Sequence, residues 1–333
     1  MWVEIESEIF FENQNIAEIR KLLQDLCYKH KYEVYINLLE VQGLSAFKSI
    51  YGDIKEVIEA FYNKFTTESC SIDFVVSSKS LSTGKFSLTE AIIFFNLPFT
   101  VILENSNNDG YFLDALQREF VKKSKKIKRF KDNHWLVYGN SGGSGNVINF
   151  IEEIRRRFSN DNRFLKCFVL LDSDLEYPQN TNTKRIKIEQ YLLENNIPYH
   201  FLEKREIENY LPDNIIATID IEDSFIKTYC KRLTHIQKDF IDIENGLNMS
   251  IDSLKKQKIN VYNLFINEND TQSDIESKLQ GLRVGIKAKF DNFKNDFPKL
   301  FEHATQEELM ERCKEQVNPN ELKDILDKIS KLL

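Results

Sequence analysis

The stretch Phe164–Asp174, FLKCFVLLDSD, decides the fold. Its centre, Phe168–Leu171 (FVLL), is a continuous apolar run, which predicts a strand buried on both faces, as in a parallel sheet covered by helices. Asp172 and Asp174 follow it. Side chains two residues apart point the same way along an extended chain, so we expect both carboxylates to face one spot. A plain polar turn is the alternative explanation of this Asp-x-Asp.

Composition narrows the class of protein. The chain has 333 residues, of which 41% are hydrophobic and 29% charged, as in an ordinary folded protein. No apolar run approaches the ~18 residues of a membrane span, and the acidic amino terminus lacks the pattern of a signal peptide, so we expect a cytoplasmic protein. Five scattered cysteines argue against a disulfide framework. The net charge of −7 means that any contact with nucleic acid must be local.

Residues 98–215 alternate between strand and helix patterns. Further strands are predicted at Phe99–Leu103, His134–Tyr138 and Pro198–Leu202, and helices at 111–120, 147–158 and 184–195. This alternation predicts right-handed crossovers and a parallel four-stranded sheet flanked by helices.

The third strand is followed by a loop rich in glycine. Four of the eleven glycines in the chain lie in Gly139–Gly145, GNSGGSG. Glycines between a strand and a helix let the backbone approach a ligand and leave amide N–H groups available to an anion, so Gly142, Gly143 and Gly145 are candidate phosphate contacts. The spacing matches neither a Walker loop nor Gly-x-Gly-x-x-Gly, which disfavours an ATP or dinucleotide site.

One strongly basic segment stands out. Arg118–Lys131, REFVKKSKKIKRFK, contains eight basic residues and one acidic residue. Its lysines are candidate nucleic-acid contacts: Lys122, Lys123, Lys125 and Lys126. A solvated helix face is an equally good explanation.

The flanking regions carry no catalytic pattern. Residues 1–97 mix strand and helix signals, including the capping box Ser87–Glu90, and suggest an α+β scaffold or docking domain. Residues 216–333 predict a helical region, with helices at 224–241, 251–265, 275–293 and within 305–333. We therefore expect three parts: 1–97, 98–215 and 216–333.

Four features fall in order at strand ends: Glu104, the glycine loop, Asp172 with Asp174, and Glu208. With these, the sequence resembles the TOPRIM fold of topoisomerases, primases and nucleases. It is most similar to TOPRIM nucleases of the OLD (overcoming lysogenization defect) type and their relatives in bacterial anti-phage systems. The stretches that carry the resemblance are ILENSNNDGYFL (102–113), YGNSGGSGN (138–146), VLLDSD (169–174) and FLEKREIENYLP (201–212). Two departures are Asn105, where many TOPRIM proteins have Gly, and Asp109, which lies five positions after Glu104 rather than the commoner four.

The resemblance implies a nuclease that uses Mg²⁺ or Mn²⁺, with two ions at the site. Hard divalent ions prefer carboxylate oxygens, and a pair of them stabilises charge on the attacking and leaving oxygens of a phosphodiester. The expected ligands are Glu104, Asp109, Asp172, Asp174 and Glu208. Glu206 supports or replaces Glu208. Lys204 and Arg205 either steady the scissile phosphate or form salt bridges with neighbouring carboxylates.

The resemblance also implies partners. We expect the chain to act on DNA or RNA, tRNA included, as the toxic effector of an anti-phage system. Since no ATPase motif is present, a separate SMC- or ABC-type ATPase chain is implied, and a homo-oligomer is compatible with this role. The alternative is a Mg²⁺-binding module that recognises nucleic acid or a partner without cutting.

Overall fold

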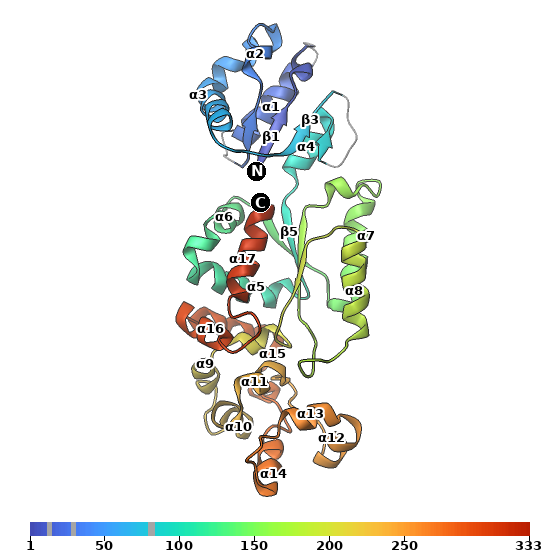
Figure 1. The fold of residues 1–333 in the computed structure, drawn as a ribbon, viewed down its shortest axis with the longest axis vertical. Coiled ribbons are helices and arrows are strands. Elements are labelled where there is room, and N and C mark those ends of the chain that lie inside the picture. The colour runs from blue at the N-terminus through green and yellow to red at the C-terminus, as the bar shows by residue number, and fades with distance from the viewer. Residues whose placement is uncertain (12–14, 28–30, 79–83) are drawn as a thin grey trace. The chain divides into compact units, whose positions relative to one another are not determined.

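The computed structural model describes residues 1–11, 15–27, 31–78 and 84–333 (Figure 1). The chain divides into two compact units. The first unit contains Met1–Pro98 and Phe158–Lys166, and the second contains Phe99–Arg157 and Cys167–Leu333. The first junction lies one residue beyond the boundary expected after residue 97. No junction lies at the boundary expected after residue 215, since the helical region is in the same compact unit as the second sheet.

The second unit is built on the parallel sheet that the sequence predicts. Its strands are β5 (Phe99–Leu103), β6 (Leu136–Asn140), β7 (Cys167–Leu171) and β8 (Tyr199–Phe201), in the order β6-β5-β7-β8 and all parallel. All five residues of β7 are buried, as its apolar run requires. Because the strands are parallel, the carboxyl ends of β5 and β7 lie at one edge of the sheet.

Helices cover both faces of this sheet. In Figure 1, α7 (Val147–Arg156) and α8 (Thr183–Glu194) lie on one side, and α5 (Ser106–Glu119) and α6 (Val121–Asp132) lie on the other. The last helix, α17 (Glu321–Leu332), packs against α6. Apolar residues from both ends of the unit share one core, since the ring of Phe112 contacts both Tyr210 and Phe301.

The carboxyl-terminal region is helical as predicted, but in shorter pieces. Lys258 divides the helix expected over 251–265, Thr234 begins a new helix with its own capping box, and the helix expected over 275–293 already ends at Gly281. The observed helices are α9 (Asp213–Ala217), α10 (Ser224–Arg232), α11 (His235–Phe240), α12 (Ile251–Gln257), α13 (Ile259–Leu264), α14 (Gln272–Gly281), α15 (Phe293–Asp296) and α16 (Gln306–Cys313).

The first unit is also a parallel α/β structure, which corrects the α+β expectation for residues 1–97. Its strands are β1 (Trp2–Ile5), β2 (Glu33–Tyr35), β3 (Ile72–Val76) and β4 (Lys85–Phe86), and its main helices are α1 (Ile16–Cys27), α3 (Ser45–Thr67) and α4 (Leu88–Asn96). The order β2-β1-β3-β4 is the same, strand for strand along the chain, as that of the second sheet. Ser77 and Ser78 follow β3, however, where Asp172 and Ser173 follow β7.

The segment Phe158–Lys166, which connects α7 to β7, is part of the first unit. The Arg163 guanidinium lies 2.8 Å from a Glu90 carboxylate oxygen and 2.6 Å from one of Asp161, and it donates to the Lys85 carbonyl at 2.8 Å. The ring of Phe164 packs edge-on against that of Phe86 in β4, with centroids 5.8 Å apart. These contacts join the segment firmly to the end of the first sheet.

We predict that Arg163→Ala lowers the free energy of unfolding by about 1–3 kcal/mol, because two part-buried carboxylates lose a charged hydrogen-bond donor. The hydrogen bond from Arg163 lowers the pKa of Asp161. A depressed carboxyl pKa stabilises the fold above the unfolded pKa and is lost as the pH falls, so the difference between parent and variant should shrink below about pH 4. Denaturant titration at several pH values measures both effects. Arg157→Ala, at an exposed pair with Glu153, is the control and should cost less than ~0.5 kcal/mol; equal losses would contradict the prediction.

Candidate metal centre

Glu104 follows β5 and is held by the glycine loop. The backbone N–H groups of Gly142 and Gly143 donate to its carbonyl at 3.1 and 3.0 Å, and the N–H of Ser144 donates to its Oε2 at 2.9 Å. Gly142 and Gly143 have φ of +76° and +105°, which side chains rarely allow. These three N–H groups of the loop are thus directed at Glu104. The expectation that Gly142 and Gly143 leave their amides free for an anion is therefore wrong.

Asp172 and Asp174 are fixed by the segment that follows β8. Asp172 Oδ1 accepts from the N–H of Ile207 at 3.0 Å, and the N–H of Asp174 donates to the Arg205 carbonyl at 3.0 Å. The chain is not extended here, because Asp174 has a φ of +53°. This left-handed conformation is uncommon outside glycine, although aspartate tolerates it better than most residues.

Asp109 and Glu208 each stand in the first turn of a helix. Asp109 lies at the start of α5, where its Oδ2 accepts from the N–H of Asn105 at 2.9 Å. Glu208 belongs to the short 3-10 helix η5 (Ile207–Tyr210). Glu206 precedes that helix and pairs with Arg205, whose Nε lies 3.1 Å away.

One cavity of about 400 Å³ at the carboxyl edge of the sheet is lined by all five expected metal ligands, Glu104, Asp109, Asp172, Asp174 and Glu208. The cavity is acidic and rich in side-chain oxygens. Its lining comprises Glu104, Asn105, Asn108, Asp109, Asn140, Gly142, Gly143, Asp172, Asp174, Glu206, Glu208, Glu244 and Lys294.

Burial and mutual repulsion oppose full ionisation of the cluster. Burial, and next the charge of Asp174, raises the pKa of Glu104 to about 7. Burial likewise raises the pKa of Asp109 and of Glu208 to about 7. The pKa of Glu206 rises to about 8 through burial and the charge of Glu208, and that of Asp172 lies well above its usual range through burial and the charge of Glu104. A bound cation would relieve this repulsion.

The donor set fits a hard divalent cation. Carboxylate and amide oxygens are the ligands that Mg²⁺ and Mn²⁺ prefer, and Glu104 Oε1 is buried without a hydrogen-bond partner among the described residues. As the side chains stand, no three Asp, Glu, His or Cys groups within the described ranges converge on one point. The backbone amides described above hold several of the carboxylates in separate positions, so an ion would have to draw the side chains together.

Lys204 and Arg205 do not line the cavity. The Lys204 side chain is fully buried, and its Nζ lies 2.6 Å from Asp239 Oδ1 and 3.1 Å from the Arg312 carbonyl. Lys204 thus forms a salt bridge with a carboxylate, which is the stated alternative to contact with the scissile phosphate. Arg205 pairs with Glu206 and, at 3.2 Å, with Asp242, which is the salt-bridge alternative.

Other residues at the site carry no signal in the sequence. Lys184, in the first turn of α8, bonds to the hydroxyl of Ser144, which lies 3.5 Å from Asp174 Oδ2. Gly145 lies next to Lys184. Glu244 and Lys294 reach the cavity from the carboxyl-terminal region. Nothing in their local spacing indicates the site, because only the tertiary fold brings them there.

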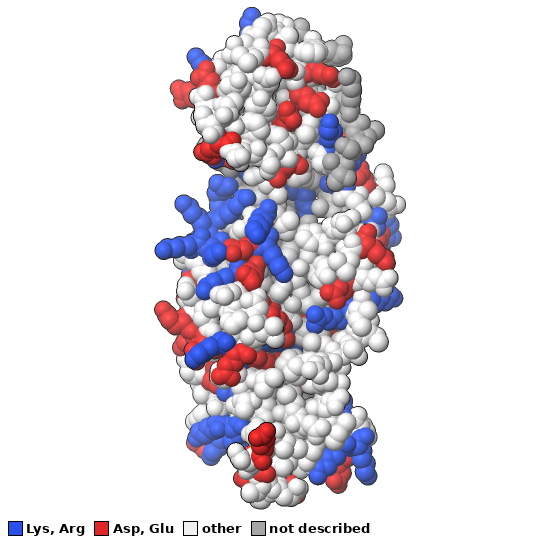
Figure 2. Space-filling view, viewed as in Figure 1, with Lys and Arg blue, Asp and Glu red and all other residues white. Residues whose placement is uncertain are grey.

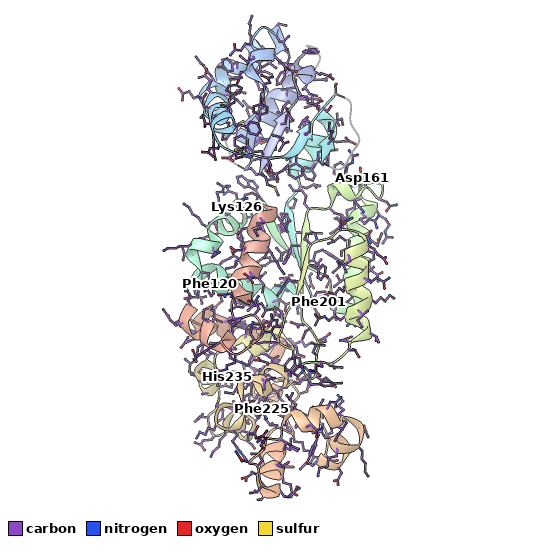
Figure 3. All side chains as sticks on the ribbon, in the orientation of Figure 1. Phe120, Lys126, Asp161, Phe201, Phe225 and His235 are labelled. Carbon is purple, nitrogen blue, oxygen red and sulfur yellow. The ribbon has the colours of Figure 1, made fainter. Side chains whose placement is uncertain are left out.

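The basic segment lies away from the cavity. It forms α6, whose end leads into the start of β6, so it lies at the amino edge of the sheet rather than at the carboxyl edge. Figure 2 shows basic side chains gathered over α6, and Figure 3 labels Lys126 there and Phe201 at the end of β8. Lys122 and Lys125 are exposed, Lys123 pairs with Asp327 at 2.6 Å, and Lys126 donates to the Ser330 carbonyl at 3.2 Å. This is the geometry of a solvated helix face.

Comparisons with protein-family models, with curated proteins and with solved structures found no match to this chain. In the part of the chain that the structure describes, no helix combines the length and the apolar character needed to cross a bilayer.

We predict that Gly143→Ala destabilises the fold by about 1–2 kcal/mol, because alanine is strained at positive φ. The added methyl would meet no atom within 4 Å, so the cost is one of backbone conformation alone. Gly145→Ala is the matched control, since its methyl would make ordinary contact with Lys184 Cε at 3.6 Å. Denaturant titration of both variants measures the difference, and the same loss in each would show that the φ of Gly143 does not matter.

Proposed function

We propose that this chain is a metal-dependent nuclease that hydrolyses phosphodiester bonds in DNA or RNA. The observation that carries the proposal is the gathering of Glu104, Asp109, Asp172, Asp174 and Glu208 around one cavity at the ends of parallel strands. The buried, unpartnered Oε1 of Glu104 supports it, because a buried carboxylate oxygen needs a donor or a cation.

In this proposal the residues of the cavity have different roles: some bind metal ions and others lie near the phosphate. Two divalent ions, when bound, supply stabilisation of the charge that develops on the attacking and leaving oxygens. Glu104, Asp172 and Asp174 would hold them, with Asp109 and Glu208 completing the set, while Glu206 stays oriented by Arg205. Lys294 at the cavity, and Lys184 through Ser144, provide positive charge near a phosphate. Lys204 does not, because it is buried away from the cavity.

The attacking group is water in this proposal. Among the described residues that line the cavity there is no Ser, Thr, Cys or Tyr, and hence no side chain able to form a covalent intermediate with phosphate through a hydroxyl or thiol. This favours hydrolysis over the strand passage of a topoisomerase.

The wider role rests on the sequence resemblance. A Glu after the first strand of the sheet and an Asp-x-Asp after the third agree with a TOPRIM nuclease of the OLD-like type. We propose an effector of anti-phage defence that works with a separate SMC- or ABC-type ATPase and uses Mg²⁺ or Mn²⁺.

The second candidate is a Mg²⁺-binding module that recognises nucleic acid without cutting. The backbone amide donors hold the carboxylates apart, which favours this candidate. Two metal ions placed for catalysis would require the carboxylates to move closer together. Cleavage assays distinguish the two candidates.

We predict that the purified chain cuts plasmid DNA or tRNA in Mg²⁺ or Mn²⁺, alone or with its ATPase partner, and not in EDTA. Glu104→Gln and Asp172→Asn should each reduce the rate by at least roughly 100-fold, because each removes an expected ligand. Glu311→Gln, at an exposed carboxylate of the same unit, should cut as the parent does. Cleavage that survives both site variants would contradict the proposed site, and metal-dependent binding without cleavage would favour the second candidate.

A further inference from the structure

A second cavity of about 640 Å³ adjoins the carboxylate cavity. The two share Glu244 and Lys294 in their linings, so they lie side by side. We call it the flanking groove. It is formed by residues 244–248 and 284–294, the latter leading into α15, which lies near the carboxyl end of the sheet in Figure 1.

The walls of the flanking groove are fixed by their backbones. The N–H of Ile286 donates to the Ile243 carbonyl and that of Lys287 to the Glu244 carbonyl, both at 3.1 Å, and the N–H of Leu247 donates to the Leu282 carbonyl at 2.9 Å. Gly246 and Gly285 permit this approach, since a methyl group on either would collide with the opposite backbone. The groove is thus preformed, which lowers the entropic cost of binding.

The charged side chains of the groove allow a phosphate to replace a carboxylate as the partner of two lysines. Glu244 lies 2.5 Å from Lys287 Nζ and 4.0 Å from Lys294 Nζ, so one carboxylate serves two lysines. The lysine side chains are 63% and 68% exposed. An ammonium group has three donors. Lys287 and Lys294 can therefore each donate to a phosphate oxygen as well as to Glu244. Asp291 is also in the lining, so the two lysines share the groove with two carboxylates.

The rest of the lining suits nucleobases and sugars. Asn245, Asn248 and Asn292 offer amide donors and acceptors, and Phe290 is half-buried. Its ring packs on those of Phe293 and Phe297, with centroids 5.5 and 5.8 Å away, and is held in place by them. Aromatic rings beside cationic groups are the elements with which proteins bind single strands.

We propose that the flanking groove binds the nucleotides next to the scissile bond as a single strand. This inference rests on the proposed function, because it assumes that a polynucleotide reaches the carboxylates. A volume of this size is that of a small-molecule site, which accommodates a few nucleotides of one strand and not a duplex. Lys287 and Lys294 contact phosphates, Glu244 is the group that the phosphates displace, and Phe290 stacks with a base.

Binding of a fluorescein-labelled single strand, measured by anisotropy with Ca²⁺ in place of Mg²⁺, tests the proposal separately from cleavage. DNA and RNA strands of one sequence show which sugar is accepted. The double variant Lys287→Gln/Lys294→Gln should bind about tenfold more weakly, and the slope of log affinity against log salt should fall by roughly 0.7 for each phosphate that the variant no longer neutralises. Phe290→Leu should also weaken binding, whereas Glu244→Gln should strengthen it, because a competing anion is gone.

The control is Lys299→Gln/Lys314→Gln, which removes two exposed, carboxylate-paired lysines of the same unit outside the groove. It should bind as the parent does. The proposal is overturned if the parent binds neither strand, if the control loses as much as the groove variant, or if only Lys122→Gln/Lys125→Gln on α6 weakens binding. If the groove binds a strand but no metal-dependent cleavage occurs, the proposed nuclease activity is refuted and the groove proposal is supported. If cleavage occurs and the groove variants bind as the parent does, the groove proposal is refuted and the nuclease activity is supported.

Discussion

Repulsion among carboxylates at one edge of the second sheet is the constraint on which the site depends. Glu104, Asp172 and Asp109 are each held by a backbone N–H from a different segment, and those segments follow β6, β8 and β5. Each backbone donor thus holds one carboxylate in its own position around the cavity. Such an arrangement costs stability unless a cation or protons offset it. Burial first, and repulsion between the carboxylates second, raises the pKa values of these groups.

The two units share a strand order but differ in the residues that follow their strands. Both sheets have the same strand order, and both are parallel. In the second unit, acidic residues follow the first and third strands and line a cavity; in the first unit, Ser77 and Ser78 follow the third strand. Since function belongs to the residues at a site and not to the fold that carries it, the shared topology does not extend the proposed activity to the first unit.

The sequence predicts the second sheet well, because buried strands have a local signature. The apolar runs before Glu104 and Asp172 fix β5 and β7, and parallel pairing then brings both carboxylates to one edge. It does not reveal what depends on distant contacts. Burial of Lys204 requires Asp239 and Arg312 from remote helices, and Lys294 lies 190 residues along the chain from Glu104, whose cavity it lines. The positive φ of Gly142 and Gly143 turns the glycine loop toward Glu104, which composition alone does not show.

The measurement that tests the central claim most directly is a Mn²⁺ titration of the purified chain, followed by the loss of the free-ion electron paramagnetic resonance signal. It requires neither substrate nor partner. Our account predicts that the parent removes Mn²⁺ from solution, that Mg²⁺ competes, and that Glu104→Gln/Asp172→Asn removes little or none while remaining folded. A parent chain that leaves the free-ion signal unchanged, or a folded double variant that binds Mn²⁺ equally well, would contradict it.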